Sequence, residues 1–137
     1  MLFGECIKSM FRNKTFVTVI NCMDGRVQYP VNQYMQQKYN ADFVDMITEP
    51  GPNKILAEAV DTTLVNSIKR RYDVSIEKHY SKVVAIVAHY DCGGNSAEKA
   101  VQILQVQEAM KLVKSWNTEI EVLGLWVDET WSVNEIN

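Results

Sequence analysis

The stretch VVAIVAHYDC, residues 83–92, decides how this chain folds. Its first six residues are apolar without interruption, which is typical of a strand buried on both faces of a parallel sheet. Asp91 or Gly93 would suffice to end that strand in a turn. His89 and Cys92 nevertheless stand at the same place, although the chain holds only three cysteines and two histidines. Two metal-binding side chains three residues apart at a strand end indicate a functional site.

A second apolar run ends in the same way. The stretch FVTVINCMDGR, residues 16–26, begins as a buried strand over residues 16–20 and then reaches Cys22. Other apolar runs predict strands over residues 42–48, 82–88 and 120–127. A last strand is expected over residues 131–136. It should be antiparallel, because so few residues separate it from the strand over residues 120–127.

Helical spacing of apolar residues separates these strands. It predicts helices over residues 2–11 and 30–39. It also predicts a long helix that carries Leu56, Val60, Leu64 and Ile68 on one side. Asn95 or Ser96 is expected to cap a further helix, whose apolar side holds Ala100, Val101, Leu104 and Val113.

Alternation of strands and helices predicts an α/β protein. We expect three α/β/α layers around a central, mostly parallel sheet of about four strands plus a C-terminal edge strand. Right-handed crossovers place the second and third strands on opposite sides of the first, so the loops after strands one and three diverge and open a crevice. Cys22 and His89 follow those two strands at their carboxyl ends, and Cys92 lies in the loop beside them. The three side chains are therefore expected to meet.

Bulk composition sets limits on the class of protein. The 137 residues suit one domain over residues 1–137, with residues 1–14 as an opening helix or arm. A net charge of −3, with 23% charged residues, gives no basic patch for nucleic acid or an anionic membrane. Neither a membrane span nor a leader peptide is visible, so a cytoplasmic location is expected. Three cysteines, an odd number, argue against a disulfide framework.

Two thiolates and one imidazole leave a position open on a tetrahedral zinc ion. That composition is typical of a catalytic zinc site, where a water takes the fourth position and its pKa falls to about 7. Cys22, Asp24 and Arg26 alternate along the first loop and would project to one side. This places a carboxylate near the metal and a cation that can hold it.

The motifs CMDGR and HYDC resemble the two signature motifs of the beta-class carbonic anhydrases. The resemblance implies that Cys22, His89 and Cys92 bind zinc and that Asp24 and Arg26 form the catalytic pair. It also implies reversible hydration of carbon dioxide to bicarbonate by zinc-bound hydroxide, with a small-molecule substrate and no nucleic acid or membrane partner.

The chain departs from that family at three places. The arm that embraces a second subunit is short, Gly25 stands where serine is common, and residues 48–53 replace the usual Arg-Asn-Ala-Gly-Asn. These changes touch the pocket wall. We still expect a homodimer or higher even oligomer, because Trp126, Trp131 and the opening helix offer apolar surface.

Other interpretations stay open. The two cysteines could be buried small hydrophobes, and Asp24 with Arg26 could be a structural ion pair. The site could belong to a non-catalytic zinc-binding or assembly module in which Asp24 completes the coordination. It could also hydrolyse a related substrate such as carbon disulfide or carbonyl sulfide. A cysteine-dependent phosphatase would need a longer phosphate-binding loop than CMDGR.

Overall fold

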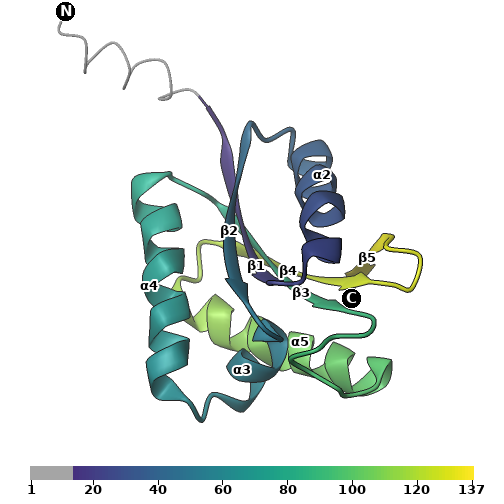
Figure 1. The fold of residues 1–137 in the computed structure, drawn as a ribbon. Helices are drawn as coiled ribbons and strands as arrows, with labels where there is room; N and C mark the ends of the chain where they lie inside the picture. The colour runs from purple at the N-terminus through teal and green to yellow at the C-terminus, as the bar shows by residue number, and fades with distance from the viewer. Residues whose placement is uncertain (1–13) are drawn as a thin grey trace, which may run out of the picture.

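A five-stranded sheet with helices on both faces forms the body of the computed structural model, which describes residues 14–137 (Figure 1). The expected opening helix lies outside the described residues. The strands are β1 (Phe16–Cys22), β2 (Phe43–Glu49), β3 (Val83–His89), β4 (Glu121–Val127) and β5 (Val133–Ile136). The helices are the 3-10 helix η1 (Gly25–Val27), α2 (Gln28–Tyr39), α3 (Pro52–Glu58), α4 (Thr62–Lys78) and α5 (Lys99–Trp116).

The strand order is β2-β1-β3-β4-β5. Strands β1 to β4 pair in parallel, and β5 pairs antiparallel with β4. The predicted α/β class, with its mostly parallel sheet and antiparallel edge strand, is confirmed. Because β2 and β3 lie on opposite sides of β1, the direction of winding reverses between β1 and β3. The carboxyl ends of those two strands meet at this reversal.

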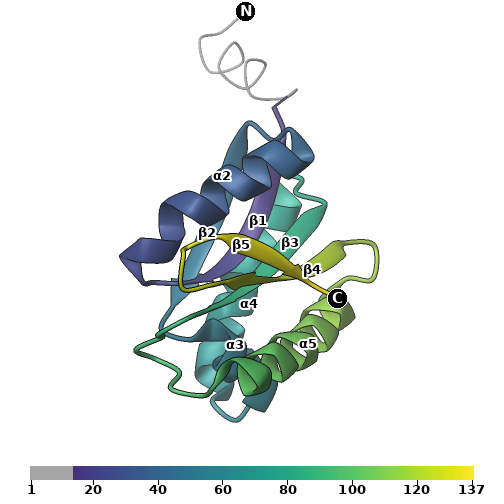
Figure 2. The same ribbon diagram turned by 90° about the vertical axis from the view of Figure 1, so that its right-hand side faces the viewer.

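Helix α2 covers one face of the sheet, and α3, α4 and α5 cover the other (Figure 2). All seven residues of β3 are buried. Val83, Ala85 and Val87 face the α2 side, whereas Val84, Ile86 and Ala88 face the other helices. Residues alternate between the two faces of a strand, so a strand covered on both sides must be apolar throughout. The stretch over residues 83–88 is apolar for this reason.

The long helix predicted around Leu56 to Ile68 is wrong as one element. Helix α3 ends at Ala59, which adopts a left-handed conformation with φ 51°, and α4 starts after Asp61. The Asp61 carboxylate caps α4 by accepting a hydrogen bond from the Leu64 amide at 3.0 Å. Val60, expected on the apolar side, lies in the break and is 79% exposed. The four-residue spacing thus continued by chance across two helices.

Helix α5 also differs from its prediction. It begins at Lys99, and neither Asn95 nor Ser96 caps it. Its buried positions are Gln102, Val106, Ala109 and Val113, so only Val113 of the predicted apolar side is buried. Val101 and Leu104 are exposed instead. The helix is therefore rotated relative to the expected apolar face.

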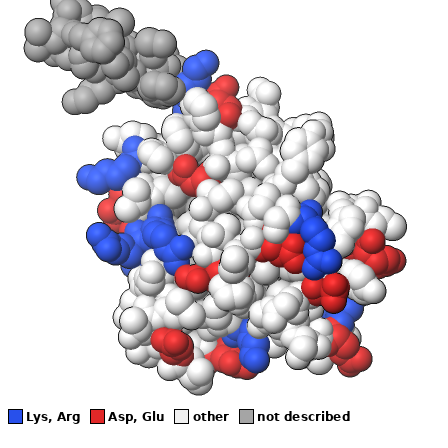
Figure 3. Space-filling view, in the orientation of Figure 1, with Lys and Arg blue, Asp and Glu red and all other residues white. Residues whose placement is uncertain are grey.

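Charged side chains of both signs lie next to one another on the face seen in Figure 3, with uncharged surface between them. This face carries no patch of a single sign. Within residues 14–137, none of the helices has the length and apolar character that crossing a membrane requires.

Candidate metal centre

The three predicted ligands come together at the carboxyl end of the sheet. Cys22 is the last residue of β1, His89 is the last residue of β3, and Cys92 lies in the loop after β3. Their ligand atoms all lie within 4.8 Å of one another. All three side chains are buried, with exposed fractions of 3%, 0% and 8%. Adjacent parallel strands end at the same edge, so the sheet itself brings Cys22 to His89.

One ring nitrogen of His89 is already engaged. Its Nδ1 lies 2.7 Å from the Tyr90 carbonyl oxygen, and because a carbonyl only accepts, Nδ1 must carry the proton. The neutral ring then presents the lone pair of Nε2. Nε2 is buried and has no hydrogen-bond partner. A buried acceptor without a partner is costly, and a metal ion at this place would satisfy it.

The distance between the two sulfurs also fits a metal. Cys22 Sγ and Cys92 Sγ lie 3.8 Å apart. Two sulfurs bound at about 2.3 Å to one tetrahedral zinc ion lie about 3.8 Å apart. The donor set of two sulfurs and one nitrogen, already at this spacing, fits a tetrahedral transition metal with a fourth position open.

The two sulfurs of the cluster interact directly. Cys22 and Cys92 share a hydrogen bond, which lowers the pKa of Cys22 and raises the pKa of Cys92. Thiolates are the form that binds metal ions, so the lowered pKa of Cys22 favours metal binding.

Asp24 and Arg26 form an ion pair beside this cluster. The Asp24 carboxylate caps η1 by accepting a hydrogen bond from the Arg26 backbone amide at 2.9 Å. It also accepts hydrogen bonds from Arg26 Nε at 3.0 Å and from Nη2 at 2.7 Å. These contacts lower the pKa of Asp24 to about 2, chiefly through the Arg26 side chain. Asp24 is therefore ionised, and it does not join the three-residue ligand cluster.

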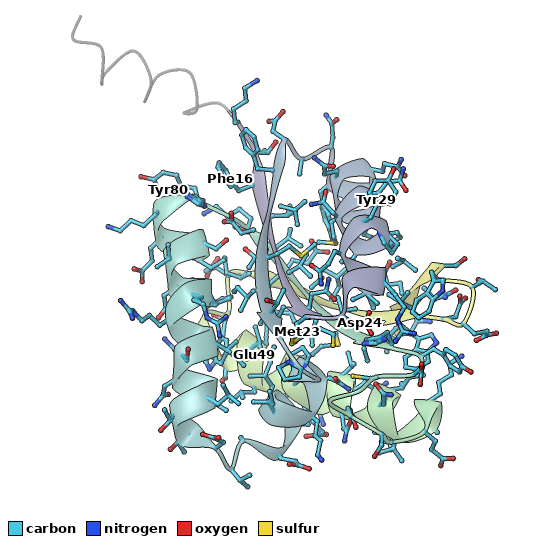
Figure 4. The ribbon with its side chains drawn as sticks, in the orientation of Figure 1. Phe16, Met23, Asp24, Tyr29, Glu49 and Tyr80 are labelled. Carbon is cyan, nitrogen blue, oxygen red and sulfur yellow. The ribbon has the colours of Figure 1, made fainter. Side chains whose placement is uncertain are left out.

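The site lies at the carboxyl-end edge of the sheet. Met23, Asp24 and Glu49 are found at the carboxyl ends of β1 and β2, opposite Phe16 and Tyr80 (Figure 4). Met23 is 62% exposed, whereas Cys22 beside it is buried. The ligands thus lie below a rim that is open to solvent.

Two glutamines that sequence reasoning missed hold the ligand loops. Gln28 Nε2 donates to the carbonyl oxygens of Cys22, at 2.7 Å, and Asp24, at 3.0 Å. Gln102 Nε2 donates to the His89 carbonyl at 3.3 Å. Both amides act on the backbone of site residues, which outer-shell groups of metal sites commonly do. Neither glutamine belongs to a motif, and their roles appear only once the loops are folded.

The loop that carries Cys92 packs tightly on the loop after β2. A Cβ atom added at Gly94 would lie 2.6 Å from the Pro50 backbone carbon, whereas one at Gly93 would meet nothing within 4 Å. We expect Gly94→Ala to lower the free energy of unfolding by about 1–3 kcal/mol, as overpacking does. Urea denaturation measures this loss. Gly93→Ala is the matched control, and equal stability of the two variants would contradict the contact.

Fold and site together define a class of protein. The doubly wound sheet carries two cysteines and one histidine at its switch point, beside an Asp–Arg pair, which is the arrangement that the resemblance to the beta-carbonic anhydrases implied. The chain belongs to the family described as "Putative carbonic anhydrase", whose model matches residues 12–137. The resemblance found in the two motifs is confirmed at this level. A comparison with curated proteins found no match to the chain.

Solved structures share the fold at low sequence identity. A carbonic anhydrase from Streptococcus mutans has a TM-score of 0.65 at 16% identity, covering 98% of this chain and 93% of that one. A tetrameric beta-carbonic anhydrase from Sordaria macrospora has a TM-score of 0.61 at 14% identity, covering 98% and 87%. The apo form of a carbon disulfide hydrolase has a TM-score of 0.57 at 14% identity, also covering 98% and 87%.

Proposed function

We propose that this protein is a zinc-dependent carbonic anhydrase that hydrates carbon dioxide reversibly to bicarbonate. The observation that carries the proposal is the three-ligand cluster of Cys22, His89 and Cys92, which Asp24 does not complete. A purely structural zinc site is closed by four protein ligands, whereas a catalytic one keeps a position open. Family membership supports the same assignment.

The three ligands would hold the zinc ion through two thiolates and the Nε2 atom of His89. Bound zinc supplies Lewis acidity that brings the pKa of a coordinated water to about 7, so hydration is expected to increase as pH rises past that value. His89 is held in the correct tautomer by the Tyr90 carbonyl. The chain's own contribution is thus a pre-arranged set of donors.

Asp24 and Arg26 have different roles in this proposal. Ionised Asp24 can only accept hydrogen bonds, so it would orient the reacting water by accepting one from it. Arg26 keeps Asp24 ionised and engages both of its oxygens, with contacts of 2.7 to 3.2 Å. Asp24 is thereby available to the water and restrained from binding the metal. Asp24 also caps η1, so the pair has a structural role as well.

A direct hydration assay on zinc-loaded protein tests this function. We expect carbon dioxide hydration, followed with a pH indicator in stopped flow, from the protein with one zinc per chain. The zinc-free protein is the control. Carbon disulfide is the second substrate to test, because the fold is shared with a carbon disulfide hydrolase. Turnover of neither substrate by fully loaded protein would leave the non-catalytic zinc module as the better interpretation.

We also propose a homodimer or higher even oligomer. Met23 and Tyr90, next to two of the ligands, are 62% and 50% exposed, and Leu104 on α5 is 62% exposed. Apolar side chains gathered near a site commonly mark an interface. The Sordaria macrospora enzyme with this fold is described as tetrameric. Trp126, which was expected to offer apolar surface, does not do so, because its side chain is 4% exposed and lies in the core.

Light scattering at micromolar concentration checks the assembly. We expect the mass of two chains or an even multiple of it. Tyr90→Lys, which places a charge on the exposed rim, should shift the protein toward monomer without changing its fold. A wild-type protein that is monomeric throughout this range would contradict the proposal.

A cytoplasmic location is proposed from the chemistry of the site. The Cys22 and Cys92 sulfurs lie 3.8 Å apart as free thiols. An oxidising compartment would favour a disulfide between thiols this close, whereas the reducing cytoplasm keeps them available for metal. Labelling of the protein in intact cells would test this location.

A further inference from the structure

The turn between β4 and β5 holds Trp131 in an unusual backbone conformation. Trp131 has φ 60°, in the left-handed region that bulky side chains rarely adopt. Asp128 fixes this turn: its Oδ1 accepts hydrogen bonds from the Thr130 and Ser132 amides at 2.9 and 3.0 Å. Its backbone carbonyl accepts another from the Trp131 amide at 2.9 Å. A turn that maintains such a costly conformation points to a role for the side chain it presents.

The Trp131 ring lies against Arg26. The Arg26 Cζ atom is 4.5 Å from the centre of the ring, well within the range of a cation–π contact. Trp131 is half-buried and packs against the core cluster on the α2 side of the sheet. Arg26 comes from η1, so this contact joins the β4–β5 turn to the loop that carries Asp24.

The other contacts of the Arg26 guanidinium are hydrogen bonds to Asp24 and Asp91, including one from Nη2 to the Asp91 carbonyl oxygen at 3.0 Å. The Arg26 side chain is 45% exposed, and ion pairs at exposed positions are weak. The second carboxylate, Asp91, lies 3.2 Å from Nη1 but is 70% exposed. Asp24 and Asp91 both bind at the edge of the planar group, and Trp131 lies over its face. The ring therefore restricts rotation of the guanidinium plane of Arg26, and Asp24 is bound at the edge of that plane.

We propose that Trp131 is a positioning residue for the Asp24–Arg26 pair: stacked on the guanidinium, it keeps Arg26 in the orientation that holds Asp24 away from the metal ligands. The proposal rests on the proposed function. Without the ring, Arg26 turns toward solvent, and Asp24 is released to occupy the fourth position on the metal. Trp131 thus acts on the open site through two other residues and without touching the substrate.

Azide binding to the cobalt(II)-substituted protein measures whether the fourth position is open. The visible spectrum of cobalt reports the coordination directly, so this readout does not depend on turnover. We expect Trp131→Ala to weaken azide binding by about two- to thirtyfold, the range that a cation–π contact corresponds to. Trp131→Phe, which retains an aromatic face, should keep most of the wild-type affinity.

Two comparisons separate positioning from a general loss of stability. Trp116→Ala removes another partly buried indole, which lies over Lys69 with the amine 6.0 Å from the ring centre, and it should leave azide binding unchanged. In an Asp24→Ala background, Trp131→Ala should have no further effect, because the residue through which it acts is gone.

Three results would overturn the proposal: an unchanged azide affinity in Trp131→Ala, an equal loss in the Asp24→Ala background, or no azide binding to the wild-type cobalt protein. The function and the positioning role can fail separately. If the protein does not hydrate carbon dioxide but the azide affinities of the variants change as expected, the enzymatic function alone is contradicted. If hydration is normal but these azide affinities do not change as expected, the role of Trp131 alone is contradicted.

Discussion

Replacing Cys22, His89 or Cys92 with Ala is expected to weaken zinc binding more than about 100-fold in each case. Loss of an outer-shell partner alone commonly costs about 10- to 100-fold in metal affinity, and these residues would be the ligands themselves. Wild-type protein should hold about one zinc ion per chain. Elemental analysis after dialysis, with competition against a chelator for the affinity, measures both quantities.

The third cysteine provides the control for this experiment. Cys6→Ala should leave the zinc content unchanged, because Cys6 belongs to neither motif. Stability should follow the metal: zinc should raise the unfolding temperature of the wild type and of Cys6→Ala, and it should not raise that of the ligand variants. Full zinc retention in a Cys22, His89 and Cys92 triple variant would refute the site.

Arg26→Ala and Asp24→Ala are expected to abolish hydration for different reasons. Both should lose activity by about 100-fold or more, within the range attributed to a positioned acid–base group, while zinc content stays near one per chain. In Arg26→Ala, Asp24 loses the hydrogen bonds of 2.7 to 3.2 Å that hold its oxygens and becomes free to bind the metal. In Asp24→Ala, the fourth position stays open but the reacting water is not oriented.

The azide titration distinguishes the two failures. Asp24→Ala cobalt protein should bind azide at least as tightly as the wild type, and Arg26→Ala should bind it poorly. Arg71→Ala is the matched control, since Arg71 forms a similar pair with Glu49 at 2.8 Å and is 39% exposed. Identical azide affinities in all three variants would show that Arg26 does not control access to the metal.

The strands and their ends could be predicted from the sequence because their signals are local. A strand covered on both faces must be apolar throughout, and a parallel sheet then brings the ends of neighbouring strands together. Cys22 and His89 could be placed at one crevice on these grounds alone. Asp24 and Arg26 do form a pair, but the extended segment that the alternation assumed was wrong, because Arg26 lies in the 3-10 helix η1 and Asp24 caps that helix.

Features that depend on tertiary contacts could not be predicted. Ala59 adopts a left-handed conformation at the end of α3, where a glycine would be the usual sequence signal. The contact of Trp131 with Arg26 depends on the turn that Asp128 fixes. The spacing of residues in the sequence does not indicate that this turn lies against the loop that carries Arg26. Gln28 likewise resembles any residue at the start of a helix until its amide is seen to hold Cys22 and Asp24.

The two sulfurs belong to positions 70 residues apart in the chain. A metal ion held between them acts as a reversible cross-link that closes this long segment, which includes β2, α3, α4 and β3. By the chain-entropy relation for covalent cross-links, a loop of that size corresponds to about 4 kcal/mol taken from the unfolded ensemble. Availability of the metal would then determine how long the folded chain survives in the cell, independently of any turnover at the site.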